Sequence, residues 1–426
     1  MNAEFAAWVG IDWADQKHDL ALLAAGSAKE EHCQIEQTPE AIDAWATELR
    51  RRFGGKPVAV CLEQSKGSLI YALMKYEFLV LYPINPKQLA RFREALAPSG
   101  SKDDPTDASW ALRLLISHRD QLRAWRPDDS ATRLIRLLVE DRRSLVEQRT
   151  RLCNQLQDRL KQVFPLALEV LGSLTTDLAA EFLLRYSSFQ ELRQAPPAEV
   201  AALYRRHGLG QAKIEERLQR IASATPLTTD VPLVESARLL IRSLATQLSA
   251  LAEPLREYDR QLAAQMRKHP DATIFESFPG AGDALAPRLL AAFGADRERL
   301  QNAAQMQDLS GISPVTRRSG RMKSVLRRWA CNKFLRQTFH EFAQHSLPRS
   351  VWAQAYYQML RQRGKKHHAA VRALAFKWIR VLFRCWKDRL TYNDLFHCGK
   401  LMQRGSPLIT HIAASAQKQD PTPQPT

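Results

Sequence analysis

The sequence predicts an α/β domain followed by a long, almost wholly helical region. Short apolar runs at residues 5–11, 18–25 and 57–62 alternate with segments of helical periodicity in the first hundred residues. The first two runs are separated by a short turn, which is typical of a hairpin and indicates a mixed sheet. Beyond residue 107, apolar residues recur at helical spacing nearly throughout.

The N-terminal elements follow one another closely. Residues 5–11 form a buried strand that ends at Asp12, and residues 57–62 form another that ends at Glu63. Between and after these two strands, the pattern predicts further strands at 18–25, 33–37 and 78–82, and helices at 39–53, 67–76 and 86–95.

Two long amphipathic helices dominate the middle of the chain. They cover residues 130–164 and 233–268, and the second contains Pro254, which interrupts or kinks it. An antiparallel coiled-coil stalk around a small helical insert explains this pattern, and helix packing within one globule explains it nearly as well. The expected domains are residues 1–127, 128–270 and 271–405, followed by a disordered tail at 406–426 whose last residues are rich in Pro, Gln and Thr.

Positive charge is concentrated near the C-terminus. The 426 residues contain 62 Lys+Arg and 45 Asp+Glu, a formal net charge of +17. Residues 315–404 alone hold 21 Lys+Arg against 3 Asp+Glu, so the remainder is close to neutral. A basic surface confined to one domain favours a nucleic-acid partner.

Cysteine usage and hydropathy restrict the class of protein further. The six cysteines form no C-x-x-C pair, which argues against a zinc site or a disulfide framework and for a reducing compartment. No apolar run is long enough to cross a bilayer, and the N-terminus lacks a signal pattern. We expect no membrane partner and a soluble, cytoplasmic protein associated with the nucleoid.

Four carboxylates form the first candidate site. Asp12 and Glu63 end two strands, while Pro105 and Asp104 suit the first position and the N-cap of a helix that also carries Asp107. Four converging carboxylates repel one another unless a hard cation lies between them, and oxygen ligands suit Mg²⁺ or Mn²⁺. Such ions can activate a nucleophile and stabilise a leaving oxygen on phosphate.

Other interpretations of these acids exist. Taken alone, residues 101–108 are a capped helix start, because acids there also complement the helix dipole. Asp15, Asp19 and Asp103 are expected to be solvated bystanders. The run from Gly10 to Asp12 also resembles the opening strand of actin-like ATPases, but residues 13–17 supply no glycine for a phosphate-binding turn.

A basic loop at residues 313–321 forms the second candidate site. Ser319 lies beside a glycine and among arginines that can clamp a phosphate, so it is a candidate nucleophile for a phosphoserine bond. Taken on its residues alone, the pattern is explained more simply by an ordinary serine that contacts a phosphate on a basic loop. The nucleic-acid-binding residues expected here are Arg317, Arg318, Arg321 and Lys323.

Further nucleic-acid contacts are expected at two turns. Gly280 and Gly282 precede a helical run, as in a helix-hairpin-helix module that holds a DNA phosphate, although a tight turn between packed helices explains them equally well. Lys365 and Lys366 separate two basic helices at 351–361 and 367–387. Most aromatic residues of this region recur at helical spacing and belong to the core, and a few can stack on bases. These aromatic residues are Trp329, Trp352, Tyr356, Tyr357, Phe376, Trp378, Phe383 and Trp386.

These motifs together resemble one family. The chain is similar to insertion-sequence transposases of the DEDD class, relatives of the Piv-type site-specific DNA invertases. The resemblance extends from about residue 7 to residue 390 and is carried, in order, by 9–12, 62–63, 101–108, 278–282, 311–314 and 319–320.

The resemblance has consequences for fold and chemistry. It implies a RuvC-like domain of ribonuclease H fold with a metal site at Asp12, Glu63, Asp104 and Asp107, and a nucleophilic serine at Ser319. It also implies donor and target DNA, a structured bridge RNA that guides the enzyme, and dimers that join into tetramers. A metal-dependent junction nuclease that does not rejoin DNA and a non-enzymatic nucleic-acid-binding protein remain the alternatives.

Overall fold

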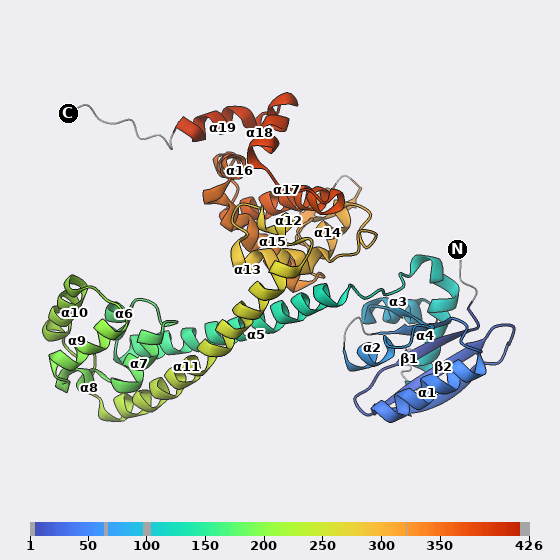
Figure 1. Ribbon diagram of the computed structural model, residues 1–426, viewed down its shortest axis with the longest axis horizontal. Helices are drawn as coiled ribbons and strands as arrows, with labels where there is room; N and C mark the ends of the chain where they lie inside the picture. Colours follow the sequence, from blue (N-terminus) through green and yellow to red (C-terminus); the bar gives the residue numbers. More distant parts are fainter. Residues whose placement is uncertain (1–4, 64–66, 97–103, 321, 418–426) are drawn as a thin grey trace. The chain divides into compact units, whose positions relative to one another are not determined.

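The computed structural model describes residues 5–63, 67–96, 104–320 and 322–417, with side chains at all of these except 104–106, 323 and 413–417. The chain divides into two compact units, Met1–Pro127 and Asp128–Thr426. Figure 1 shows the elements of both units, which are described separately below.

The first unit is built on a five-stranded mixed sheet in the order β3-β2-β1-β4-β5. β1 pairs in parallel with β4 and antiparallel with β2. β2 also pairs antiparallel with β3, and β4 pairs in parallel with β5. The mixed α/β fold predicted from the sequence is confirmed and is consistent with a ribonuclease H-like domain. The strands are β1 (Ala7–Asp12), β2 (Lys17–Ala24), β3 (Glu31–Glu36), β4 (Val58–Leu62) and β5 (Leu79–Pro83).

Helices cover both faces of this sheet. Val9 and Ile11 of β1 share one apolar cluster with α1 and α2, whereas alternate residues such as Ala59 and Cys61 of β4 pack against α4. This division follows from the period of two in a strand. The helices of the unit are α1 (Pro39–Arg52), α2 (Ser68–Leu73), α3 (Pro86–Leu96) and α4 (Asp104–His118), followed by the 3₁₀ turn η1 (Arg119–Gln121).

Two long helices, α5 (Ser130–Val163) and α11 (Val231–Lys268), pack along each other in the second unit. Ile135, near the start of α5, shares a cluster with Met266 at the end of α11. Leu160, near the end of α5, shares another with Ile241 in the first half of α11. The two helices are therefore antiparallel. Pro254 lies inside α11, which continues through it.

Short helices between α5 and α11 form a separate apolar cluster with the adjoining halves of these two helices. The large buried side chains of this cluster include Phe164, Phe182 and Tyr204, and the rings of Phe182 and Tyr204 stack with centroids 6.1 Å apart. The inserted helices are α6 (Leu166–Leu171), α7 (Asp177–Arg185), α8 (Phe189–Gln194), α9 (Pro197–Arg206) and α10 (Gln211–Ser223).

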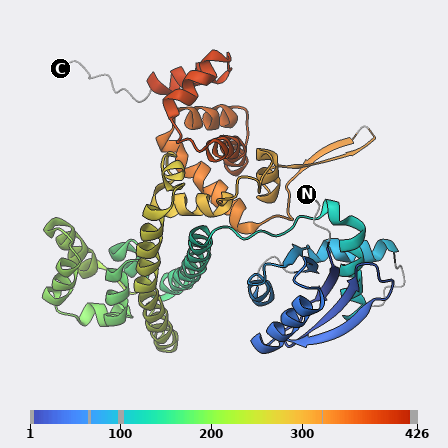
Figure 2. The ribbon, with the colours of Figure 1, turned by 45° about the vertical axis from the view of Figure 1, so that its right-hand side comes forward.

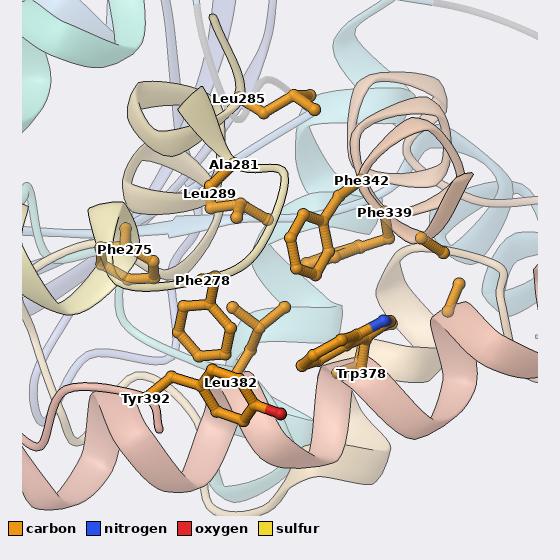
Figure 3. Packing of buried hydrophobic residues seen from close by; sticks show 14 of the residues in the cluster. Phe275, Phe278, Ala281, Leu285, Leu289, Phe339, Phe342, Trp378, Leu382 and Tyr392 are labelled. Carbon is orange, nitrogen blue, oxygen red and sulfur yellow. The ribbon is translucent and has the colours of Figure 1, made fainter. Parts of the chain in front are cut away.

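The remaining helices enclose an aromatic core, part of which Figure 3 shows. Trp378 of α17 lies at its centre, and its indole N–H donates to the Ser346 hydroxyl at 2.8 Å. Ile135 and Met266 also belong to this core, so its packing crosses the boundary predicted at residue 270. The helices are α12 (Ala272–Glu276), α13 (Gly282–Phe293), α14 (Ala303–Leu309), α15 (Lys333–Ser346), α16 (Val351–Gln362), α17 (His367–Asp388), α18 (Asp394–Gln403) and α19 (Leu408–Gln417), with the 3₁₀ turn η2 (Leu347–Arg349) before α16.

Two predictions are wrong. The segment expected to be a loop at 313–321 belongs to a two-stranded antiparallel hairpin, β6 (Val315–Ser319) and β7 (Met322–Leu326). The tail predicted at 406–426 contains the helix α19, where Leu408 and Ile412 enter the core because both are apolar and one helical turn apart. Residues 418–426 lie outside the described residues. Among the helices that the structure describes, none is long and apolar enough to cross a membrane.

Candidate active site

The register of β1 and β4 places two predicted carboxylates side by side. Ile11 pairs with Leu62 in the parallel ladder, and the next residue on each strand is Asp12 and Glu63. Neighbouring strands lie about 4.8 Å apart, so the two acids leave the same edge of the sheet as near neighbours. Both side chains are partly exposed.

A close contact between β1 and α4 positions the third element of the site. A Cβ atom on Gly10 would lie 2.1 Å from the carbonyl oxygen of Ala108 and 2.4 Å from the amide nitrogen of Leu112. The helix backbone therefore touches the strand, which only glycine permits here. By alternation Asp12 faces the same side of the sheet as Gly10, and Asp107 precedes Ala108 in the first part of α4. The helix start predicted at Asp104 is confirmed.

Asp107 is held by an arginine that the sequence did not single out. Its carboxylate is only 13% exposed and accepts a hydrogen bond from Arg93 of α3, with 2.5 Å between Oδ1 and Nη1. The guanidinium supplies the positive charge that a partly buried carboxylate requires. The side chain of Asp104 lies outside the described side chains.

Asp19, predicted to be a solvated bystander, lies directly opposite Asp12 in the antiparallel pair of β1 and β2. Residues opposite each other in such a pair share one face of the sheet. One oxygen of Asp19 accepts a hydrogen bond from the side-chain amide of Gln34 at 2.7 Å. Asp19 is therefore a further acid on the face that carries Asp12.

The turn between β1 and β2 is anchored by a buried histidine. His18 is fully buried, its Nδ1 accepts from the backbone amide of Ala14 at 3.3 Å, and its Nε2 lies 2.5 Å from the side-chain oxygen of Gln37. Burial lowers the pKa of His18, although the hydrogen bond to Gln37 acts against it. The neutral ring thus fixes the chain that leaves Asp12.

The donor set fits a hard cation. The acids available at this edge are carboxylates on rigid elements, which is the ligand type that Mg²⁺ and Mn²⁺ prefer. Among the side chains that the structure describes, no three Asp, Glu, His or Cys side chains already converge on one point as metal ligands. The Arg93 guanidinium contacts Oδ1 of Asp107, so a cation bound by this carboxylate would compete with a positive charge already present.

The second predicted site lies at the tip of the hairpin. Ser319 is the last residue of β6, pairs with Met322 of β7, and is followed by Gly320 with φ +53°. Arg317 shares the face of Ser319, because the two are separated by one residue, whereas Arg318 points to the other face. Arg321 and the side chain of Lys323 lie outside what the structure describes. From Thr316 to Arg327, every described side chain is exposed.

The base of the hairpin is fastened by one carboxylate. Asp308 of α14 accepts from the hydroxyl of Ser313, which precedes β6, and from Nη2 of Arg328, which follows β7, at 2.9 Å for the arginine. A hydrogen bond also joins α14 to α17, because the side-chain amide of Gln307 donates to the carbonyl oxygen of Phe376 at 2.8 Å. The hairpin is therefore an exposed arm on a fixed base.

The turn before α13, which contains Gly280 and Gly282, is packed against another helix, whereas the turn before α17, which contains Lys365 and Lys366, is exposed. A Cβ on Gly280 would lie 2.3 Å from the carbonyl oxygen of His345, so Gly280 lets the turn before α13 pack against the end of α15. Gly282 has φ +50° and open space beside it. Lys365 and Lys366 are exposed, and Lys366 is the N-cap residue of α17. Their contacts with nucleic acid remain predictions.

Comparison with known proteins identifies the class. A family model described as a transposase of the DEDD type found in IS110 matches residues 9–165, and a model described as "Transposase IS116/IS110/IS902 family" matches residues 272–358. The first range contains the carboxylate residues and the second contains the hairpin. The chain is thus a DEDD transposase.

Whole-chain relatives agree with this class. A protein of the mini-circle element IS117 from Streptomyces coelicolor is 28% identical over 92% of this chain and 97% of its own length. A protein of insertion element IS116 from Streptomyces clavuligerus is 27% identical over 91% of this chain and 96% of its own length. The chain belongs to the IS110/IS116/IS902 family of insertion-sequence transposases, which cleave and rejoin DNA.

Proposed function

We propose that the protein cleaves and rejoins DNA by metal-dependent chemistry in which Ser319 forms a transient phosphoserine bond. The observation that carries this proposal is the register of β1 and β4, which brings Asp12 and Glu63 to one edge beside the start of α4. In many enzymes that transfer phosphoryl groups, converging carboxylates hold a cation against the phosphate.

Asp12, Glu63, Asp104 and Asp107 would hold the Mg²⁺ or Mn²⁺. A bound cation polarises the scissile phosphate and stabilises the departing oxygen. The chain itself contributes rigidity, because Gly10 fixes α4 against β1 and His18 fixes the turn after Asp12. Arg93 pairs with the Asp107 carboxylate before a cation arrives.

Ser319 would act as the nucleophile. Its Oγ forms a bond to phosphorus and loses its proton, while the bond from phosphorus to one deoxyribose oxygen breaks and that oxygen takes up a proton. A hydroxyl of a second DNA strand then attacks the same phosphorus and releases the serine. Arg317 on the same face supplies positive charge to the phosphate.

We also propose the partners that the family resemblance implied. Donor and target DNA, and a structured bridge RNA that selects them, suit the concentration of positive charge in residues 315–404. A dimer that assembles into a tetramer through coiled-coil packing of α5 and α11 suits the exposed apolar side chains of these helices, among them Leu134, Leu137 and Leu239.

The metal site is tested by a matched pair of variants. Asp12→Asn should abolish cleavage of a DNA carrying the element's ends in the presence of Mg²⁺, while Asp15→Asn, an exposed acid in the following turn, should leave cleavage intact. Normal cleavage by Asp12→Asn would disprove the metal site.

The serine is tested with a second pair. Ser319→Ala should abolish covalent protein–DNA adducts on a denaturing gel, whereas Ser324→Ala, an exposed serine on β7 of the same hairpin, should form them normally. Cleavage without any adduct would favour a hydrolytic junction nuclease. Binding with no cleavage at all, with or without Mg²⁺, would favour a non-enzymatic nucleic-acid-binding protein.

A further inference from the structure

The hairpin presents apolar side chains to solvent as well as basic ones. Met322 and Val325 are 78% and 62% exposed, and they lie on opposite faces of β7. Figure 2 shows the two strands extending away from the helices of their own unit. An arm exposed on both faces is suited to contact a partner.

Next to this arm lies a cationic cluster, defined here as Arg327, Arg336, His340, His368 and Arg372. Arg336 and His340 are one turn apart on α15, and His368 and Arg372 are one turn apart on α17, which packs against α15. The rings of His340 and His368 have centroids 5.6 Å apart. Three segments that are distant in sequence therefore bring positive or protonatable groups together.

Two described acids of this unit are paired with arginines outside the cluster. Glu341 of α15 pairs with Arg288, and Asp308 at the base of the hairpin pairs with Arg328. Burial, followed by the neighbouring Arg327 and Arg336, lowers the pKa of Arg372. Like charges are held this close at a free-energy cost, which a polyanion would relieve.

An exposed tryptophan adjoins the cluster. Trp329 is 75% exposed, whereas Trp352, Trp378 and Trp386 are buried in the core of the same unit. The Arg327 guanidinium carbon lies 4.7 Å from the centre of the Trp329 ring. An indole beside an arginine, open to solvent, is a platform on which an unpaired base can stack.

We propose that Trp329 and the cationic cluster bind an unpaired stretch of the DNA strand that is cleaved, with phosphates on Arg336 and Arg372 and one base stacked on Trp329. The strand is single because stacking on Trp329 needs a base outside the duplex. It is DNA because the adjoining hairpin carries Ser319. The choice of DNA rests on the proposed function of Ser319.

The stacking contact is tested by fluorescence anisotropy with a labelled single-stranded DNA, without Mg²⁺. Trp329→Ala should weaken binding by about tenfold, the range found when one stacked base is lost. Trp329→Phe should retain most of the affinity, and Phe396→Ala, an exposed ring of α18 beside Lys400, should bind normally. Duplex DNA of the same sequence should lose less than about twofold with Trp329→Ala.

The phosphate contacts are tested by the salt dependence of the same binding. Arg372→Gln and Arg336→Gln should each lower the slope of log affinity against log salt by about 0.7, the value for one single-strand phosphate contact. Arg384→Gln, at the far end of α17 and paired with Asp388, should leave the slope unchanged. Melting temperatures of all variants confirm that the fold is intact.

The outcomes separate this inference from the catalytic proposal. Unchanged DNA binding by Trp329→Ala and Arg372→Gln would overturn the inference even if Ser319 forms adducts. The expected losses with no adduct at Ser319 would support the binding site and refute the serine. A larger loss for single-stranded RNA of the same sequence than for DNA would overturn the assignment of the strand as DNA.

Discussion

Two regions of the molecule are held in place in opposite ways. One is the carboxylate edge of the first unit, where Asp12 and Glu63 leave the sheet beside α4, and the other is the hairpin of β6 and β7 in the second unit. Asp12 and Asp107 are positioned by close packing, since α4 touches β1 at Gly10 and no Cβ fits between them. Ser319 lies on a hairpin whose described side chains are exposed and whose base is fastened by Asp308. The carboxylates thus lie beside a packed core, whereas Ser319 lies on an exposed hairpin.

Because of this difference, substitutions in the two regions should affect activity and folding stability in different ways. Substitutions near the carboxylate edge disturb the packing of the sheet together with any metal ligands, so stability and activity fall together. Substitutions on the hairpin leave the aromatic core of the second unit untouched, so activity can be lost while stability is kept. The predictions below test this separation, from the largest effect to the smallest.

Replacing the glycine at the contact of β1 and α4 should have the largest effect. Gly10→Ala places a methyl group 2.1 Å from the Ala108 carbonyl oxygen, and the helix must move away. We expect the first unit to lose about 3 kcal/mol or more of stability, measured by urea unfolding. Gly399→Ala, which meets nothing within 4 Å in α18, should be neutral or slightly stabilising.

Loosening the base of the hairpin should affect activity more than stability. Asp308→Asn removes the charge that binds Arg328 and weakens the contact with Ser313. We expect faster hydrogen exchange of the β6 and β7 amides and about tenfold fewer adducts, with a melting temperature within a few degrees of wild type. Asp283→Asn, an exposed acid in the first turn of α13, should change none of these quantities.

Removing the arginine that pairs with Asp107 should alter cation affinity. Arg93→Gln leaves the Asp107 carboxylate without its guanidinium partner, so it should bind Mn²⁺ about three- to fivefold more tightly, as expected for a pair worth roughly 1 kcal/mol or less. Calorimetric titration of the full chain measures this change. Weaker Mn²⁺ binding would show that Arg93 orients the site, and Arg91→Gln, exposed on the same helix, is the control.

The buried histidine should make the first unit sensitive to acid. Because the pKa of His18 in the folded state is lowered below its usual 6.5, the unfolded state binds more protons below that pH. Stability should therefore fall as the pH drops from 6.5 towards the folded pKa, by at most about 1.4 kcal/mol per pH unit. His18→Gln should remove this part of the pH dependence of urea unfolding, and exposed His32→Gln should retain it.

The sequence predicted the first unit better than the second site. Strand runs such as 57–62 are continuous and apolar, so both their ends and the acids that follow could be located. Arg93 and His18 could not be predicted as parts of the site, because their roles depend on contacts with other elements. The position of Asp19 opposite Asp12 could not be predicted either, because it depends on the register of β1 and β2.

The hairpin escaped prediction for a physical reason. Residues 315–326 contain four Lys and Arg and do not alternate apolar with polar residues, because neither face of the hairpin packs on the core. Strand pairing here is maintained by backbone hydrogen bonds and by Asp308, which lies outside the segment. Helix α19 was missed for a different reason. The Pro, Gln and Thr content of the last residues led to a prediction of disorder for the whole segment 406–426, which includes the apolar residues of α19.

The central claim is that Ser319 carries the covalent link to DNA while the carboxylate edge holds the cation. Mass spectrometry of the trapped, nuclease-trimmed adduct tests it most directly. The account predicts a nucleotide linked through phosphate to the peptide that contains Ser319, formed with Mg²⁺ and absent from Asp12→Asn. A nucleotide on another side chain, or cleaved DNA with unmodified protein, would contradict it.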